Sequence, residues 1–329
     1  MGRTMATIKD VAALSGVTVT TVSRMLNERG YVSEKTKNKI KKAMKELNYQ
    51  PNEIARSLST KKSKIIGLIV PSASNHFFCK VIDAVEHHAS QHGYKLLLCN
   101  SNHDNTKELE YFNMLNANKV AGVIVASHTQ DLGNSIKTDA LVISIDRVIS
   151  SQIPSVCSDN YQGGVLAAEH LIERGCKKLA HVSGSLYLNM DANKRYYGFR
   201  EVCEKRGVPY ILLDASEEQF LSMAYEDIVA GLLDQNPDVD GIFTSNDILA
   251  AQVIQACYAR GICIPEQMKI VGYDDIDVCK LCTPQITTIH QAIRDICQYA
   301  VESIVFKSEK RAIPNSVTFP VSLIKRGTT

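Results

Sequence analysis

From residue 65 onward, short apolar runs alternate with segments of helical periodicity, and this alternation limits the folds open to the chain. Helical patterns are expected around 77–91, 106–118, 161–174, 192–206, 217–234 and 247–260. The apolar runs before residue 161 are IIGLIVP, YKLLLCNS, AGVIVAS and LVISID, and those after it are KLAHVSG, ILLDA, GIFTSND and KIVGYDD. Such runs suit strands buried on both faces of parallel sheets that helices cover. Because the rhythm restarts near residue 161, we predict an α/β body of two doubly wound parallel-sheet subdomains.

The first 64 residues differ from this body in charge. Residues 1–64 hold 14 Lys/Arg and 5 Asp/Glu, a net charge of +9, whereas residues 65–329 have a net charge of −7. A small basic segment attached to an acidic body indicates a head that binds a polyanion. A solvated basic tail is the alternative, but this segment has helical periodicity throughout.

Within the basic head, residues 8–27 contain two helical patterns joined by a tight turn. Gly16 suits the turn, Thr18 can cap the second helix, and Val22 and Leu26 would face inward. The spacing favours a helix-turn-helix over an ordinary helical hairpin. Ser33 can cap a third helix, whose many lysines can add attraction to phosphates.

If the second helix lies in the major groove of DNA, its outward side chains fall into two groups. Val19, Thr20 and Arg24 would reach base edges, because Arg can bond guanine and Val or Thr can meet a thymine methyl. The phosphate contacts, which position a protein without specifying sequence, would come from Thr21, Ser23 and Asn27.

A short helical segment, PNEIARSL, stands between the head and the body. It could hold only about seven residues, and isolated helices under roughly 12 residues are marginal in water. We therefore expect a hinge whose stability comes from elsewhere. The expected organisation is a DNA-binding head of 6–51, a hinge and linker of 52–63, and a body of 64–329, divided into subdomains of about 64–160 with 291–320 and of about 161–290.

Polar side chains follow the predicted strands, where ligands bind in doubly wound sheets. They are Ser72, Ser74, Asn75, Asn100, Ser101, Ser127, His128, Asp146, Arg147, Asn246, Asp247, Asp274 and Asp275. Any one of them could equally be a helix cap. As a set, they offer the hydrogen-bonding groups that a sugar ring requires, and Phe77 and Phe78 could stack on a sugar face. The sequence thus predicts a sugar-binding cleft between the subdomains.

Several other functions lack sequence support. The chain has no G-x-S-x-G, G-x-x-x-x-G-K-[ST] or G-x-G-x-x-G motif, so we expect no enzyme activity. The lone Cys279/Cys282 and His88/His92 pairs lack the further ligands of a zinc site. The ten scattered cysteines fit reduced thiols, and no secretory signal or membrane span is evident, so a cytoplasmic protein is expected.

These motifs together resemble the LacI/GalR family of bacterial transcription repressors over residues 6–326. The resemblance rests on TIKDVAALSGVTVTTVSRMLN, GYVSEKT, LNYQPNEIARSL, IGLIVP, SIDR, SDNYQGG, TSND, VGYDD, TTIHQ and PVSLIKR. Within the family, the chain looks most similar to the sugar-operon repressors of Gram-positive bacteria, of the ribose or sucrose type.

The resemblance implies a homodimer with a periplasmic-binding-protein-like core that binds pseudo-palindromic operator DNA. It implies a sugar or sugar-phosphate effector, no cofactor, and release from DNA when the effector binds. The chain ends soon after PVSLIKRGTT, without the helix that makes some members tetrameric. Arg195, Asn246, Asp274, Asp146 and Phe220 match the family's effector-contact positions.

The resemblance also gives the hinge a role. Ala55 would pack against its copy in the dimer, and Leu58 would insert between base pairs in the minor groove. One departure concerns the first effector loop, where His76 replaces the proline of the family's Asn-Pro-Phe-Phe. The competing interpretation is a sugar-binding transport receptor, because the body alone resembles one.

Overall fold

The computed structural model describes residues 6–27, 29–50, 63–127, 138, 140–188, 190–309 and 313–329. The chain forms two compact units, a head within residues 1–64 and a body made chiefly of residues 65–117 and 121–329. The expected hinge helix, with Ala55 and Leu58, lies outside the described residues. Among the helices that are described, none is both long and apolar enough to cross a membrane.

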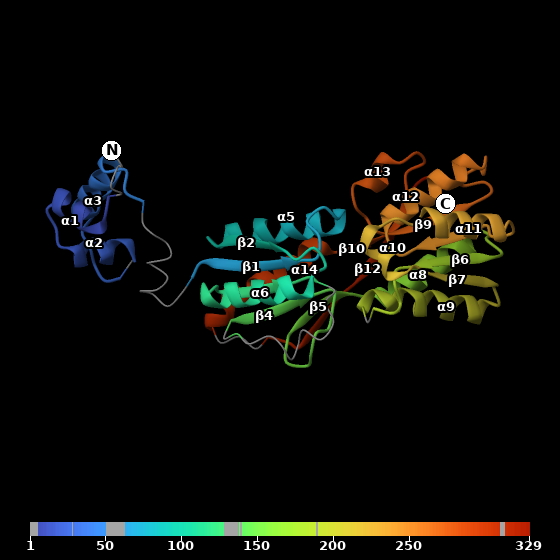
Figure 1. Cartoon of the computed structure of the whole chain (residues 1–329), viewed down its shortest axis with the longest axis horizontal. Coiled ribbons are helices and arrows are strands. Elements are labelled where there is room, and N and C mark those ends of the chain that lie inside the picture. The colour runs from blue at the N-terminus through green and yellow to red at the C-terminus, as the bar shows by residue number, and fades with distance from the viewer. Residues whose placement is uncertain are drawn as a thin grey trace. The chain divides into compact units, whose positions relative to one another are not determined.

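The described part of the head is a bundle of three helices, α1 (Ile8–Ser15), α2 (Val19–Leu26) and α3 (Glu34–Glu46) (Figure 1). The predicted caps are confirmed, because Thr18 accepts from Thr21 N and Ser33 accepts from Thr36 N. Gly16 ends α1 with a φ of 65°, a conformation that favours glycine. The head's small core consists of Val11, Ala12, Val22, Ile40 and Ala43.

The first lobe of the body is a six-stranded parallel sheet in the order β11-β5-β4-β3-β1-β2. Its strands are β1 (Ile65–Val70), β2 (Lys95–Asn100), β3 (Gly122–Val125), β4 (Leu141–Ile145), β5 (Ser155–Ser158) and β11 (Ser316–Phe319). Helices α5 (His76–Gln91) and α14 (Ile293–Val305) pack together over one face. The other face carries α6 (Asn105–Ala117), whose Leu115 fills the space above Gly67. The short 3₁₀ helix η2 (Phe306–Glu309) follows α14.

The second lobe has a six-stranded sheet in the order β12-β10-β9-β8-β6-β7. Its strands are β6 (Leu179–Ser183), β7 (Tyr210–Asp214), β8 (Gly241–Thr244), β9 (Lys269–Asp274), β10 (Thr287–Gln291) and β12 (Val321–Ile324). Helices α8 (Asn160–Glu173) and α9 (Lys194–Arg206) cover one face, and α11 (Glu226–Gln235) and α12 (Asp247–Ala259) cover the other. Three short helices complete the lobe, η1 (Asp191–Asn193), α10 (Glu217–Ser222) and α13 (Val278–Leu281).

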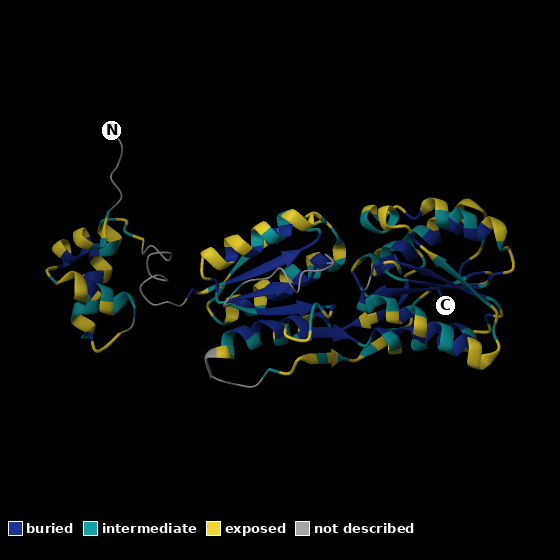
Figure 2. Ribbon diagram, turned by 60° about the horizontal axis from the view of Figure 1, so that its bottom comes forward, coloured by how far each residue is buried: buried dark blue, intermediate teal, exposed yellow. Residues whose placement is uncertain are grey.

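The prediction of two doubly wound sheets is confirmed, with three local corrections. The helix expected over 217–234 is two helices, because Met223 ends α10 in the left-handed conformation, with a φ of 57°. Strand β2 is not buried on both faces, since it lies at a sheet edge and Leu98 is 41% exposed. Strand β12 runs antiparallel to β10, at the other sheet's edge. The burial colouring shows the strands as the dark interior of each lobe (Figure 2).

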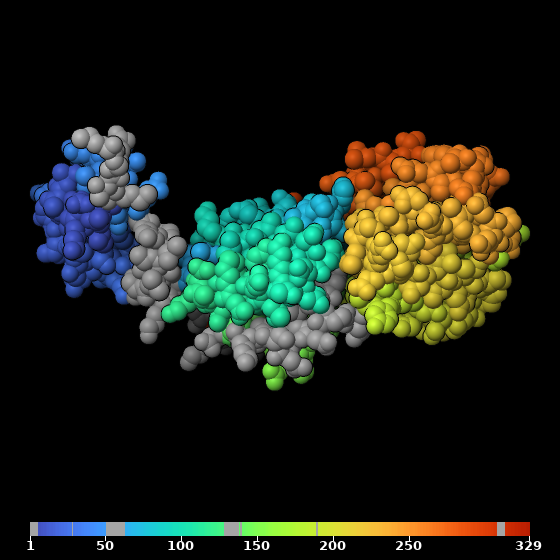
Figure 3. All heavy atoms as spheres, viewed as in Figure 1, coloured from blue at the N-terminus to red at the C-terminus, as the bar shows by residue number. Residues whose placement is uncertain are grey.

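The chain passes from one lobe to the other after β5, after β10 and after β11. The space-filling view shows the lobes meeting along a seam (Figure 3). Because the carboxyl ends of parallel strands converge at one edge of each sheet, side chains that follow several strands are brought together there.

Candidate functional site

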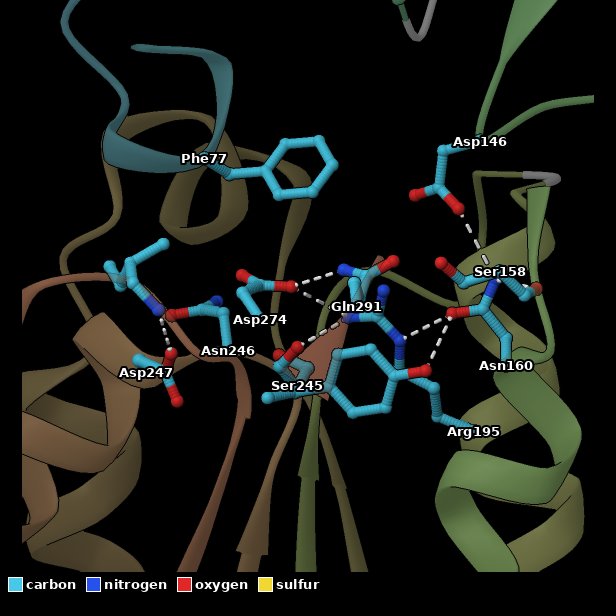
Figure 4. A network of polar contacts seen from close by, with 12 residues as sticks. Phe77, Asp146, Ser158, Asn160, Arg195, Ser245, Asn246, Asp247, Asp274 and Gln291 are labelled. Carbon is cyan, nitrogen blue, oxygen red and sulfur yellow. Dashed lines mark hydrogen bonds and ion pairs between the residues drawn. The ribbon is translucent and has the colours of Figure 1, made fainter. Parts of the chain in front are cut away.

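A cavity of about 200 Å³ lies in the body, lined by residues of both lobes. All eight residues that the sequence suggested for an effector lie on its wall: Ser74, Phe77, Phe78, Asp146, Arg195, Phe220, Asn246 and Asp274. In the close view, Phe77 and Asp146 lie on the first-lobe side, opposite Asp274, Asn246 and Arg195 of the second lobe (Figure 4).

The first-lobe wall is formed by the loop after β1 and the start of α5. Asn75 caps α5, because its Oδ1 accepts from the Phe77 N–H at 2.9 Å. The Phe77 ring meets the Phe78 ring edge-on, with the ring centroids 5.2 Å apart, and Phe78 is buried in the core. Phe77 thereby remains available to face the cavity. His76 does not line this cavity and instead lines a second one, which shares Asp274 and Ile276 with the first.

Arg195 is held in place by the close crossing of α8 and α9. A Cβ added to Gly164 would lie 1.9 Å from the Arg195 carbonyl oxygen, and one added to Gly198 would lie 2.1 Å from that of Tyr161. Only glycines allow the two backbones to approach so closely. Their contact brings the first turn of α9 beside the first residue of α8, Asn160.

The Arg195 guanidinium is buried and held by contacts to several groups. Its Nε donates to Asn160 Oδ1 at 2.8 Å, and its Nη1 donates to the Ser245 carbonyl at 2.6 Å. It also stacks over the Tyr273 ring at 3.6 Å and lies 4.0 Å from Asp274 Oδ1. These contacts fix a single positive charge at the floor of the cavity.

Two carboxylates face this charge from opposite lobes. Asp274 ends β9 with a φ of 106°, and Gln291 Nε2 donates to its Oδ1 at 2.6 Å. Asp146 follows β4 with a φ of 56°, and Asn160 Nδ2 donates to its Oδ1 at 3.3 Å. Burial raises the pKa of both carboxyls, and the charge of Arg195 opposes that shift. The two acids are acceptors ready for hydroxyl groups.

The remaining predicted residues divide between capping and lining. Asn246 caps α12, since its Oδ1 accepts from the Leu249 N–H at 2.8 Å, and it also lines the cavity. Phe220, at the cavity wall on α10, faces Gly184, where an added Cβ would lie 3.1 Å from the ring. Phe220 and Phe77 offer apolar surface from the two lobes.

Among the residues at the site that sequence reasoning missed are Asn160, Ser245 and His181. Asn160 accepts from Arg195 and Tyr273 and donates to Asp146 and Asp191, so it joins the charged groups of both lobes. The Ser245 hydroxyl lines the cavity and has no hydrogen-bond partner among the described residues. His181 lines it too, and burial lowers its pKa to about 3, so it stays neutral. Asn160 and Ser245 lie in SDN and TSND, the polar segments at the ends of β5 and β8.

This arrangement suits a small polyhydroxylated ligand. Carboxylates and a serine hydroxyl can accept from hydroxyl groups, amide and guanidinium groups can donate to them, and aromatic rings can cover the apolar face of a sugar ring. No group of three or more metal-binding side chains occurs in the part of the chain that the structure describes.

The head presents a separate candidate surface on α2. Val19 is 40% exposed, and Thr20 and Arg24 are exposed, so the three predicted base contacts share the open side of the helix. The predicted phosphate contacts are partly buried: Thr21 Oγ1 lies 2.9 Å from Thr18 Oγ1, and Asn27 Nδ2 donates to Ser23 Oγ at 3.2 Å. These bonds steady both ends of α2.

Two family profiles match the chain. The profile of bacterial regulatory proteins of the lacI family matches residues 7–52, and that of the periplasmic binding protein-like domain matches residues 168–329.

Curated relatives match along nearly the whole length. The ribose operon repressor of Halalkalibacterium halodurans is 37% identical over 99% of this chain and 97% of its own. The sucrose operon repressor of Streptococcus mutans is 38% identical over 97% of this chain and 98% of its own.

Solved structures agree with this similarity. The lac repressor dimer bound to operator and the anti-inducer ONPF is 27% identical, with a TM-score of 0.86 over 99% of each chain. A periplasmic binding protein/LacI transcriptional regulator from Alkaliphilus metalliredigens, complexed with D-xylulofuranose, is 33% identical. Its TM-score is 0.70, over 81% of this chain and 99% of that one.

Proposed function

Because the chain belongs to the LacI family of bacterial regulatory proteins, we propose that it represses transcription of a sugar-utilisation operon. In this proposal, the head binds operator DNA and the cavity of the body binds a sugar that controls this binding. The function requires no cofactor and takes place in the cytoplasm.

The proposal rests on one observation: a single chain contains both a helix-turn-helix head and a cavity suited to binding a sugar. The second-lobe groups around Arg195 and the first-lobe groups Phe77 and Asp146 close on one small space. Relatives named as ribose and sucrose operon repressors support a sugar as the effector, as do neighbours complexed with D-xylulofuranose and with cellobiose. A transport receptor would need no basic head.

The proposal assigns DNA contacts to the head and to the segment that follows it. Val19, Thr20 and Arg24 contact base edges, and Thr21, Ser23 and Asn27 contact phosphates. Within the hinge of 52–63, Ala55 and Leu58 lie over the minor groove. A homodimer places two heads on the two halves of a pseudo-palindrome, and sugar binding releases the DNA.

The test is operator binding by the full chain, measured by fluorescence anisotropy on the pseudo-palindrome upstream of its own gene. Specific binding should exceed binding to random duplex by at least about 1,000-fold and weaken steeply with salt. Addition of sugars should release the operator. Equal affinity for operator and random duplex would refute the proposal.

A variant pair sharpens this test. Arg24→Ala should weaken operator binding by about 5- to 150-fold, because a bidentate arginine–guanine contact contributes about 1–3 kcal/mol of discrimination. Arg206→Ala removes the same charge from the exposed end of α9 in the body and should leave operator affinity unchanged. Equal losses in the two variants would indicate a nonspecific charge effect instead.

A further inference from the structure

We propose that the cavity takes one unphosphorylated monosaccharide, and that its charge and size exclude sugar phosphates and disaccharides. This inference rests on the proposed function, since it names the class of effector that the same site binds.

The charge of the wall disfavours a phosphate. Among the described residues that line the cavity, Arg195 is the only lysine or arginine, and it faces the two carboxylates of Asp146 and Asp274. Burial lowers the pKa of His103 and of His181, so neither adds a positive charge at neutral pH. A phosphate monoester brings close to two negative charges at pH 7. It would therefore meet a single guanidinium that already faces two carboxyl groups, and each of these that is ionised repels it.

Part of the donor capacity of Arg195 is already used, including that of Nε. Phosphates in proteins are typically held by an arginine fork that donates two parallel bonds. Here Nε and Nη1 already donate to Asn160 and Ser245, and the guanidinium plane is covered by Tyr273. Turning the guanidinium toward a phosphate would leave the buried Asn160 oxygen with fewer donors.

Two helix N-termini at the wall, those of α5 and α12, are capped by asparagine side chains, whereas α9 has no side-chain cap at Asn193. An open helix N-terminus is a ready phosphate site, because its free N–H groups point at the ligand. Helix α5 is capped by Asn75, which accepts from the Phe77 N–H, and α12 is capped by Asn246, which accepts from the Leu249 N–H. The first residue of α12 is itself a buried carboxylate, Asp247. The caps of α5 and α12 and the Asp247 carboxylate suit hydroxyl groups better than a phosphate.

The size of the cavity limits the ligand to a single ring. Its volume of about 200 Å³ is below the roughly 300 Å³ at which pockets for drug-sized ligands begin. The aromatic surface is correspondingly small, with Phe77 and Phe220 each reaching the wall from one lobe. The Phe220 ring already lies against Gly184, so it has no room to withdraw toward that residue for a second ring.

The experiment is calorimetric titration of the full chain with matched sugars at pH 7.5. The probes are D-ribose, D-xylulose, D-fructose and D-glucose, a phosphate ester of each, and the disaccharides sucrose and cellobiose. At least one free monosaccharide should bind. Its phosphate ester should bind at least about 100-fold more weakly, since two like charges about 6 Å apart at an effective dielectric constant of 20 repel by nearly 3 kcal/mol. Both disaccharides should bind more weakly than that monosaccharide.

A charge variant tests the cause of the selection. Asp146→Asn should narrow the gap in binding affinity between the free sugar and its phosphate ester by at least about tenfold, because one repelling charge is removed. Asp227→Asn makes the same change on the exposed side of α11 and should leave the gap as it is. An unchanged gap in Asp146→Asn would show that this carboxylate does not exclude phosphates.

Three results would overturn the inference: tighter binding of a phosphate ester, tightest binding of a disaccharide, or no binding of any free monosaccharide in the panel. Operator binding of the same preparation separates this inference from the proposed function. If a sugar phosphate releases the operator, the function stands and the inference is wrong. If the chain does not distinguish operator from random duplex, the function is wrong, while the titrations still decide which sugar class the cavity takes.

Discussion

At the scale of single residues, Asn160 connects groups that the two lobes contribute separately. Its amide nitrogen donates to Asp146 and Asp191, and its oxygen accepts from Arg195 at 2.8 Å. The isosteric change Asn160→Asp would remove the hydrogen bonds that Asn160 donates to Asp146 and Asp191. It would also place a third carboxylate beside theirs. We expect it to lower the free energy of unfolding by about 2–4 kcal/mol and to weaken sugar binding at least about tenfold.

The measurements are urea unfolding, followed by far-UV circular dichroism because the chain has no tryptophan, and calorimetric sugar titration. The matched control is Asn113→Asp on the exposed side of α6, which should change neither quantity. If Asn160→Asp binds sugar as tightly as the unaltered chain, the connecting role of Asn160 is refuted.

Residues of this kind limit what the sequence could predict about the site. Asp146, Asn246 and Asp274 could be predicted, because each follows a recognisable apolar strand and strand ends converge. Asn160 starts a helix where the chain crosses between lobes, and its partners are 14 to 113 positions away. Such a role depends on tertiary contacts, which no local pattern encodes.

At the scale of elements, the crossing of α8 and α9 depends on two glycines, and Gly164 offers the clearest test. Its missing Cβ would lie 1.9 Å from a backbone oxygen, which cannot move independently of α9. Gly164→Ala should therefore lower the free energy of unfolding by about 3 kcal/mol. It should also weaken sugar binding, because the clashing oxygen belongs to Arg195.

The control for this change is another helical glycine. Gly231 lies in α11, where the nearest atom to an added Cβ is a Gln235 side-chain nitrogen at 4.0 Å. Gly231→Ala should stabilise the chain by up to about 1 kcal/mol, because alanine favours helix over glycine. Urea unfolding of both variants checks the pair, and equal effects of the same sign would contradict the close-crossing explanation.

The elements also show which parts of the fold follow from local sequence. Helices and strands with long apolar patterns were predicted to within a few residues, since burial of those faces determines them. Strands β5 and β10, with the sequences SVCS and TTIHQ, were not predicted. Apart from the exposed His290, their polar residues are buried because neighbouring strands pair with them. The break between α10 and α11 was missed for a similar reason, since Met223 adopts a left-handed conformation that its residue type does not favour.

At the scale of the whole body, an ion pair between described residues joins the two lobes at the second cavity, which His76 also lines. Lys80 of α5 donates to the Asp277 carboxylate at 3.2 Å and to the Asp275 carbonyl at 3.1 Å, in the loop after β9. A ligand held by both lobes favours the arrangement in which this pair forms, so the pair and the ligand stabilise the same state. Losing the pair should therefore weaken ligand binding without unfolding either lobe.

We predict that Lys80→Met weakens sugar binding by up to about fivefold, because a partly exposed ion pair contributes at most about 1 kcal/mol. Lys178→Met is the matched control, since it removes a pair of similar exposure that lies within the second lobe, between Lys178 and Asp238. Calorimetric titration should show weaker sugar binding in Lys80→Met alone. The difference in affinity between this variant and the unaltered chain should shrink in 0.5 M salt, because salt screens the ion pair. If both variants lose the same affinity, or if salt leaves the difference intact, the ion pair between the lobes does not contribute to sugar binding.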